Sequence, residues 1–313
     1  MLPPALLVAI VCAVVLAPER AHAGAWTLEE GRLWGKLAVL HLSSDQLFAT
    51  ETDAGLLGCA NGAGEAIVIG PRDRRPYDCT TGGTFRVTAV YAELALGLLD
   101  ELEVSLQVPW IADVRFSNTS GLDGRDSGIG DLRASLRYRV LAQPFVGTLA
   151  FQVKVPSGRF TTDEAVPPLG EGQWDLTFSA QAGRSFGRGY LNADVGYRVR
   201  LPNDDTRIDV GDEILTSLEG GASLHPRFAL RAASALLWGF ESENVGSAVL
   251  ARPRRWVLEG RFTAAVVVHE HVGLEAFVFV PLVGEGWPAN ATYGIAVSGT
   301  TPKLWDRRRG GGE

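Results

Sequence analysis

Residues 173 to 201 read QWDLTFSAQAGRSFGRGYLNADVGYRVRL and contain two alternating segments separated by a short turn. Before the turn, apolar side chains such as Phe178 alternate with polar ones such as Asp175. After it, Val195 and Tyr197 belong to a second alternating series. Because successive side chains of a strand point to opposite faces of a sheet, this pattern predicts a β-hairpin with one apolar and one polar face. The fold of the whole chain depends on what covers the apolar face, a second protein layer or lipid.

The same alternation recurs along nearly all of the chain, and no window after residue 23 shows convincing helical periodicity. Clear examples are LEVSLQVPW at 102–110, DLRASLRYRV at 131–140 and RWVLEGRFTAAVVVH at 255–269. The pattern predicts about 12 strands, centred near residues 38, 91, 108, 135, 150, 178, 195, 219, 234, 262, 277 and 296. The sequence therefore predicts an all-β protein.

The connections between these strands alternate between tight turns and longer polar loops. The tight turns lie near residues 98–101, 141–144, 186–189, 224–227 and 269–273. The longer loops lie near residues 50–84, 117–128, 157–171, 202–212 and 241–253. This rhythm is typical of bacterial outer-membrane barrels, whereas soluble β-sandwiches use Greek-key connections. We therefore predict a transmembrane antiparallel up-and-down β-barrel over residues 24–305, with its apolar face against lipid and the long loop 50–84 on the outer side.

The first 23 residues differ from the rest. The apolar run ALLVAIVCAVVLA at 5–17 is followed by AHA at 21–23, which is the pattern of a signal peptide and its cleavage site. We expect export to a Gram-negative outer membrane, with both termini periplasmic and with help from the barrel-assembly machinery. The charged tail at 306–313 is expected to be disordered.

Two cysteines follow the expected signal peptide, Cys59 and Cys79, and both lie in the loop at 50–84. In an oxidising compartment an even pair predicts a disulfide that closes the loop. Two free thiols are the alternative.

The net charge of −7 argues against a nucleic-acid partner, which normally requires a basic surface. The expected partners are outer-membrane lipid and a small-molecule solute. No cofactor is expected.

The polar face of such a barrel lines its interior, where function is expected. The interior set of charged residues predicted by the alternation is Glu93, Glu103, Arg133, Arg137, Arg139, Lys154, Asp175, Asp194, Arg198, Arg200, Glu219, Arg231, Glu259, Arg261 and Glu275. Both signs are interspersed, which favours ion pairing inside the barrel over a charge-selective pore. The local excess of arginine at 133–139 and 198–200 is a candidate anion attractor.

Two histidine motifs suggest other chemistry. His41 and Ser43 lie two residues apart and share a strand face, as in outer-membrane lipid deacylases and phospholipases. An acyl hydrolase is therefore an alternative to a non-enzymatic channel, and a structural or adhesive surface barrel is another. The HEH motif at 269–271 lies in a tight turn with no third strong ligand nearby, so no metal site is expected.

Four stretches resemble a group of bacterial outer-membrane transporters named after the meta-cleavage pathway of phenol degradation. They are GIGDLRASLRYRVL at 128–141, VKVPSGRF at 153–160, GEGQWDLTF at 170–178 and ADVGYRVRLPND at 193–204. The resemblance implies a barrel over roughly residues 85–300 that transports small molecules, with aromatic or other hydrophobic compounds as candidates. It implies no catalytic residues.

Overall fold

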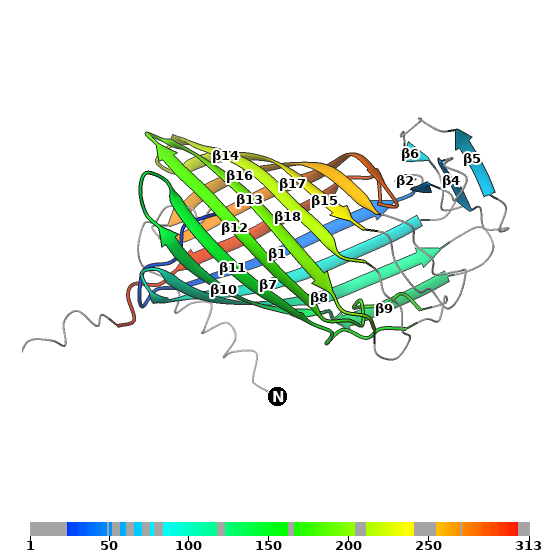
Figure 1. The fold of residues 1–313 in the computed structure, drawn as a ribbon, viewed down its shortest axis with the longest axis horizontal. Coiled ribbons are helices and arrows are strands. Elements are labelled where there is room, and N and C mark those ends of the chain that lie inside the picture. The colour runs from blue at the N-terminus through cyan, green and yellow to red at the C-terminus, as the bar shows by residue number, and fades with distance from the viewer. Residues whose placement is uncertain are drawn as a thin grey trace, which may run out of the picture.

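The structure is a computed structural model, and it is an all-β barrel (Figure 1). It describes residues 24–48, 84–117, 123–161, 166–203, 211–240, 255–269 and 271–305, together with the backbone of short strands between 50 and 77. Within these residues, no helix is long and apolar enough to cross a membrane. The expected signal peptide (1–23), Cys79 and the tail at 306–313 lie outside the described residues.

In the described part of the chain, twelve strands form the barrel wall. They are β1 (Leu33–Ser44), β7 (Thr84–Leu99), β8 (Leu102–Ser117), β10 (Leu132–Leu141), β11 (Val146–Val155), β12 (Asp175–Phe186), β13 (Gly189–Arg200), β14 (Glu213–His225), β15 (Phe228–Gly239), β16 (Trp256–His269), β17 (Val272–Glu285) and β18 (Thr292–Thr300). All twelve predicted strand centres fall within these strands, so the predicted fold class is confirmed.

The strands pair in an up-and-down order, and every pairing in the wall is antiparallel. The ring closes through the pairing of β1 with β18 and of β8 with β10. β9 (Asp123–Ile129) pairs with the far part of β8 and continues into β10 after a break at Gly130 and Asp131. Within the described residues, each of the twelve wall strands therefore pairs with a neighbour on both sides, as strands that cross lipid must.

The two ends of the barrel differ. The tight-turn end carries the five short connections, and the first and last described segments also lie there (Figure 1). The backbone amide of Leu304 donates to the carbonyl of Gly31, 2.7 Å away. The long-loop end carries the remaining connections.

Part of the loop predicted at 50–84, together with Leu47 and Phe48 before it, is folded into small sheets at the long-loop end (Figure 1). They are built by β2 (Leu47–Phe48), β3 (Thr50–Glu51), β4 (Leu57–Ala60), β5 (Ala66–Gly70) and β6 (Pro76–Tyr77). The sequence reading treated this segment as loop because such short strands carry almost no periodic signal. Cys59 lies in β4, but the predicted disulfide falls outside the residues whose side chains the structure describes.

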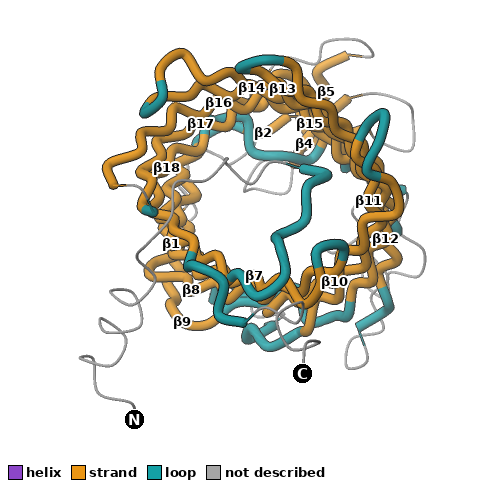
Figure 2. Tube along the Cα trace, turned by 90° about the vertical axis from the view of Figure 1, so that its left-hand side faces the viewer, coloured by secondary structure: helices purple, strands orange, loops and turns teal. Residues whose placement is uncertain are grey.

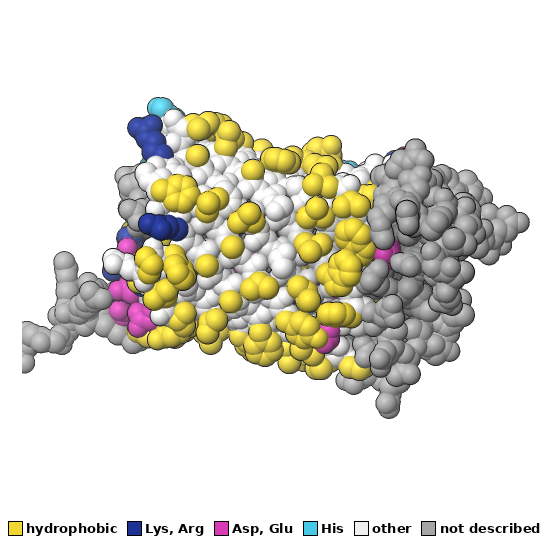
Figure 3. Space-filling view, turned by 45° about the horizontal axis from the view of Figure 1, so that its top comes forward, with side chains coloured by type: hydrophobic (Ala, Val, Ile, Leu, Met, Phe, Trp, Pro, Cys, Tyr) yellow, Lys and Arg dark blue, Asp and Glu magenta, His cyan; other side chains and the backbone are white. Residues whose placement is uncertain are grey.

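The barrel exposes its apolar side chains and buries its charged ones. Phe178, Val195 and Leu218 face outward and are 53%, 54% and 56% exposed, whereas the inward-facing Asp175 and Glu213 are 2% and 0% exposed. In Figure 3 hydrophobic side chains cover the visible wall, and charged side chains lie toward its ends. This inside-out distribution is expected of a protein whose surrounding medium is lipid.

Large aromatic side chains gather near the ends of the outward face. Trp110, Trp174, Tyr197 and Phe240 lie toward the long-loop end and are 42–50% exposed, and Phe186 lies at the tight-turn end. Such girdles mark the two membrane–water interfaces. Their placement indicates that the apolar face of the barrel meets lipid.

We predict that Leu218→Arg, on the outward face at the middle of β14, lowers the free energy of unfolding by about 2–4 kcal/mol, because it places a guanidinium in hydrocarbon. The neighbouring Ser217 faces the interior, so Ser217→Arg should change the free energy of unfolding much less. Urea unfolding of the two refolded variants in lipid vesicles, followed by tryptophan fluorescence, measures both values. Equal losses at the two positions would contradict the assigned faces.

Candidate functional site

A short N-terminal segment crosses the interior at the tight-turn end (Figure 2). We call residues 24–32 the strap. At one end of the strap, the amide of Gly31 donates to the carbonyl of Gly97 on β7 (2.8 Å). Near the other end, the amide of Ala25 donates to Oδ1 of Asn192 on β13 (2.9 Å). In the ring of twelve strands β13 lies six strands from β1 in either direction, so the strap spans the full width of the interior.

Charged side chains of the wall hold the strap. Oε2 of Glu103 accepts from the amide of Leu28 (2.8 Å), and its other oxygen accepts from Arg137 (2.8 Å). Arg137 also donates to the carbonyl of Gly24. Ala25 and Leu28 are 0% and 1% exposed. The predicted interior residue Arg137 therefore fixes a segment of backbone as well as pairing with a carboxylate.

Glycines in the wall make room for the strap. A Cβ at Gly97 would lie 2.1 Å from the carbonyl oxygen of Glu29, and a Cβ at Gly183 would lie 2.7 Å from the ring of Trp26. Any larger residue at these two positions would push the strap away from the wall. Trp26 also packs edge-on against Tyr190, with ring centroids 5.8 Å apart.

At the long-loop end, eight charged side chains form one ion network. Its cations are Lys154, Arg198, Arg200 and Arg255, and its carboxylates are Asp131, Glu171, Asp175 and Glu213. Lys154 Nζ lies 2.8 Å from Asp175, and Arg198 lies 2.6 Å from Glu213. The network contains four charges of each sign and is therefore neutral overall. Burial of charged side chains is tolerated when each one is paired with a charge of opposite sign.

The loop between β11 and β12 folds against this network and brings Glu171 to it. The carboxylate of Asp131 accepts from the amides of Gly158 (3.0 Å) and Glu171 (2.8 Å). Gly158 and Gly170 face each other so closely that a Cβ at Gly158 would lie 2.8 Å from the Cα of Gly170. The two glycines thus allow the loop to close on itself.

Glu171 remains ionised in this position. Burial raises the pKa of its carboxyl group, but the facing Arg200, Lys154 and Arg255 outweigh that effect and hold the pKa well below its usual range. Glu171 is therefore a fixed negative charge that ties the loop to three cations from different parts of the wall.

Next to the ion network lies an interior cavity of about 770 Å³. Its apolar lining includes Tyr91, Leu237, Phe279 and Trp287, and its charged lining includes Arg133, Asp194, Arg198, Glu259 and Arg261. It extends along β13 as far as Asp194, two residues from the strap anchor Asn192. A cavity of this size and mixed lining suits a small organic molecule.

Two of the cavity cations are placed to bind such a molecule. Arg261 lies over the ring of Phe279 (5.1 Å) and pairs with Glu259 (2.9 Å). Arg133 donates to Gln107 (3.3 Å) and forms no ion pair with any carboxylate in the described part of the chain. Arg133 is thus the cavity cation that is free to bind an anionic or strongly polar group.

All of the charged residues predicted for the interior lie on the inward face. Besides those already placed, Arg139 follows Arg137 on the same face, and Glu219 accepts from the hydroxyl of Tyr190. Glu275 pairs with Lys36 (2.7 Å) and Arg231 (3.0 Å). The predicted arginine cluster is divided: Arg133 lines the cavity, Arg137 holds the strap, and Arg198 and Arg200 belong to the ion network.

Four members of the ion network escaped the sequence reading: Asp131, Glu171, Glu213 and Arg255. Glu171 lies in a loop, where alternation assigns no face. Asp131 and Arg255 directly precede β10 and β16 and share the parity of the inward residues there, but the predicted interior set did not include them. Glu213 opens β14, but the apolar Leu215 shares its inward face and obscures the pattern. A further signal was that Asp131 and Glu171 lie within the Gly-rich stretches that carry the family resemblance.

His41 and Ser43 both lie on the outward face of β1 and are exposed. Nδ1 of His41 bonds to the hydroxyl of Thr88 (2.9 Å), and Ser43 lies opposite Arg86. The structure thus engages the imidazole with Thr88 rather than with Ser43. Among the described residues no group of three or more His, Cys, Asp or Glu side chains gathers as a metal site.

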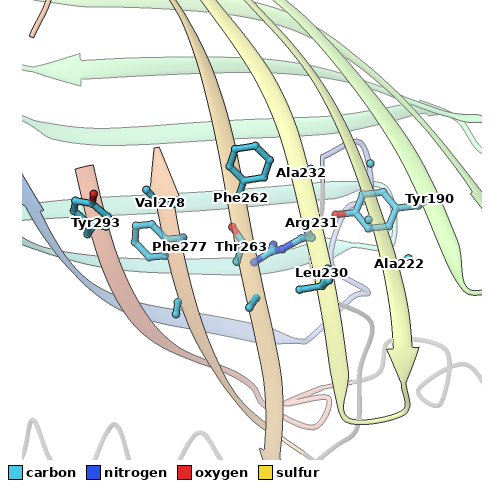
Figure 4. Close-up of a pocket in the computed structure, with 14 residues that line it drawn as sticks. Tyr190, Ala222, Leu230, Arg231, Ala232, Phe262, Thr263, Phe277, Val278 and Tyr293 are labelled. Atoms are coloured by element: carbon cyan, nitrogen blue, oxygen red, sulfur yellow. The ribbon is translucent and has the colours of Figure 1, made fainter. Parts of the chain in front are cut away.

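A second hollow of about 770 Å³ lies at the wall formed by β13 to β18 (Figure 4). The wall is thin there because Gly220, Gly221, Ala232 and Ala264 contribute little or no side chain. Outward-facing Phe262 borders it, 52% exposed, so the hollow opens toward the lipid-facing side.

We predict that Lys154→Met destabilises the barrel by about 3–5 kcal/mol, because it leaves buried carboxylates without their central cation. Lys303→Met is the matched control, since Lys303 is 39% exposed and lies 3.5 Å from Glu29. That change should cost less than about 1 kcal/mol. Urea unfolding compares the two variants, and equal losses would contradict a stabilising network.

The pH dependence of Glu171 provides a second test. The pKa of Glu171 is lower in the folded protein than in the unfolded chain, where it is about 4.3. The ionised carboxylate therefore stabilises the fold at any pH above about 4.3, and this contribution is lost as the pH falls toward the folded-state pKa. The difference in unfolding free energy between the wild type and Glu171→Gln should therefore stay constant from pH 7 to about pH 5 and shrink below about pH 4. Urea titrations across this range measure it, and a difference that grew on acidification would contradict the assignment.

Comparison with solved structures shows the same architecture in an outer membrane channel. The "COG4313 outer membrane channel" from Pseudomonas putida F1 is 19% identical, with a TM-score of 0.69 over 90% of this chain and 100% of that one. The translocator domain of the autotransporter NalP from Neisseria meningitidis is 12% identical (TM-score 0.46, 94% and 93% covered). The P. putida toluene transporter TodX is 8% identical (TM-score 0.40, 89% and 92% covered). No curated protein matches the sequence.

A family model matches residues 81–265, which is more than half of the chain. The matched region contains Asp131, Gly158, Gly170 and Glu171, which build the loop and its part of the ion network. The chain belongs to the family described as "Putative MetA-pathway of phenol degradation".

Proposed function

We propose that this protein is an outer-membrane channel that passes small molecules through the interior of the barrel. In this proposal the long-loop end faces outward and the tight-turn end faces the periplasm, as in other barrels with this loop asymmetry. The observation that carries the proposal is the cavity of about 770 Å³ beside the ion network, inside a closed ring of strands. The name of the solved structure with the same fold, an outer membrane channel, agrees with it.

The lining of the cavity suggests the class of solute. Aromatic side chains, Tyr91, Phe279 and Trp287, provide surface for an apolar or aromatic body. Arg133 provides one cation without a carboxylate partner in the described part of the chain. A guanidinium binds carboxylate, phenolate or phosphate oxygens well. We therefore propose aromatic or other hydrophobic compounds that carry one polar or anionic group.

The ion network and the strap narrow the route of a solute through the barrel interior, one at each end. The network secures the loop that carries Glu171 at the long-loop end, and the strap crosses the interior at the tight-turn end. Charges that neutralise each other hold these two elements without creating a strong field along the path. This arrangement favours a narrow channel for specific small molecules over a wide, charge-selective pore.

The alternative functions have less support. Acyl hydrolysis would need His41 to activate Ser43, whereas Nδ1 of His41 bonds to Thr88. If lipid deacylation is found and survives Ser43→Ala, that alternative is wrong. An adhesive role would depend on the loop between Cys59 and Cys79. Under that alternative, deletion of residues 59–79 should abolish binding to a partner and leave the conductance of the barrel unchanged.

We predict that the refolded chain from Gly24 onward gives steady ohmic conductance steps in a planar bilayer. Arg133→Glu should shift the ion preference toward cations, because it reverses the charge at the cavity wall. Reversal potentials under a salt gradient measure the shift. The matched control is Arg188→Glu, an exposed residue in a tight turn, which should leave the preference nearly unchanged. A folded barrel that stayed electrically silent would contradict the open channel.

A further inference from the structure

The strands β1, β7, β8 and β9 lie side by side in one sector of the barrel (Figure 1). The apolar face of this sector ends at a clear boundary. The last apolar row consists of directly paired neighbours: Val39 opposite Val90, Val90 opposite Trp110, and Trp110 opposite Ile129. Val39, Trp110 and Ile129 are 37%, 50% and 47% exposed. A tryptophan at this point marks the edge of the hydrocarbon.

Beyond that edge the same outward face becomes polar and then cationic. The next row contains His41, Thr88 and Asp113, with Thr88 opposite both of the others. The row after it is made of arginines. Arg86 lies directly opposite Arg115, and Arg115 lies directly opposite Arg125. Three arginines thus lie side by side on adjacent strands.

Among the described residues, a single carboxylate pairs with this row of three arginines. Asp113 accepts from Arg115 (2.9 Å) and from Arg125 (2.6 Å). Arg86 forms no ion pair with any described residue, and Asp123, one row farther out on β9, forms none with Arg125. Like charges directly opposite each other destabilise a sheet, so the row favours an additional anion.

The position of these arginines along the membrane normal indicates that the anion is a lipid headgroup. Arg86 lies four residues beyond Val90 on β7, which is about 13 Å along a strand and about 10 Å along the membrane normal at the usual tilt. Headgroups occupy the layer just outside the hydrocarbon. The arginines are therefore level with the headgroups of the leaflet whose acyl chains meet Val90 and Trp110.

We propose that Arg86, Arg115 and Arg125 bind the phosphate groups of a phosphorylated glycolipid of the outer leaflet, with lipid A chemistry. Its acyl chains would lie along the row of Val39, Val90, Trp110 and Ile129. Guanidiniums form bidentate bonds with phosphate oxygens, and three in a row suit a headgroup that carries two phosphates. The proposal rests on the orientation proposed above, with the long-loop end outward.

Binding of lipid A to the folded chain tests the site. The refolded protein in detergent is titrated with bis-phosphorylated lipid A, with its dephosphorylated form and with inorganic phosphate. The test variant is Arg86→Gln/Arg115→Gln, and the matched control is Arg184→Gln, an exposed outward arginine at the tight-turn end of β12. Folding of each variant is checked by heat-modifiable gel mobility, and conductance is recorded for each.

We expect at least about a tenfold loss of affinity for bis-phosphorylated lipid A in the test variant, since two of the three guanidiniums that would bond to its phosphates are removed. The control variant should bind like the wild type, and dephosphorylated lipid A should bind weakly to all three. Equal affinity of the test variant and the wild type would overturn the site. Inorganic phosphate that bound as tightly as the lipid would overturn the lipid as its ligand. Unchanged conductance in a variant that has lost the lipid would separate this site from the channel.

Discussion

The constraint on which the rest of the structure depends is that lipid cannot hydrogen bond to a peptide group. Every amide and carbonyl in the wall must therefore pair with a neighbouring strand, and the pairings of β1 with β18 and β8 with β10 complete that requirement. In the closed barrel the outward face contacts lipid and therefore carries apolar side chains, and the polar side chains face the interior. The charged residues then lie close together in a confined space, where each one needs a partner.

The ion network shows how the chain meets that need at one end. Its eight members come from strands and loops that are far apart in sequence, from Asp131 to Arg255. Buried ion pairs of this kind contribute little net stability, but they penalise any arrangement that leaves one charge alone. The network therefore specifies where the loop carrying Glu171 lies, and the contact of Gly158 with Gly170 specifies its shape.

Alternation was sufficient to predict the barrel, its twelve strand centres and the inward charged residues. It works because a strand has only two faces, and a lipid medium makes the two faces chemically opposite. It gave no information about the strap, whose residues follow no period and whose partners Asn192 and Glu103 are distant in sequence. Nor did it assign Glu171, because loop residues are placed by tertiary contacts rather than by a repeat.

The strap has a consequence for the order of assembly. Its bonds join β7 at one wall to β13 at the opposite wall, and these strands hold fixed positions relative to each other only after the ring has closed. Docking of the strap is therefore a late event in folding. Trp26, which packs against Gly183 and Tyr190 only in the docked strap, is a natural fluorescent reporter of that final step.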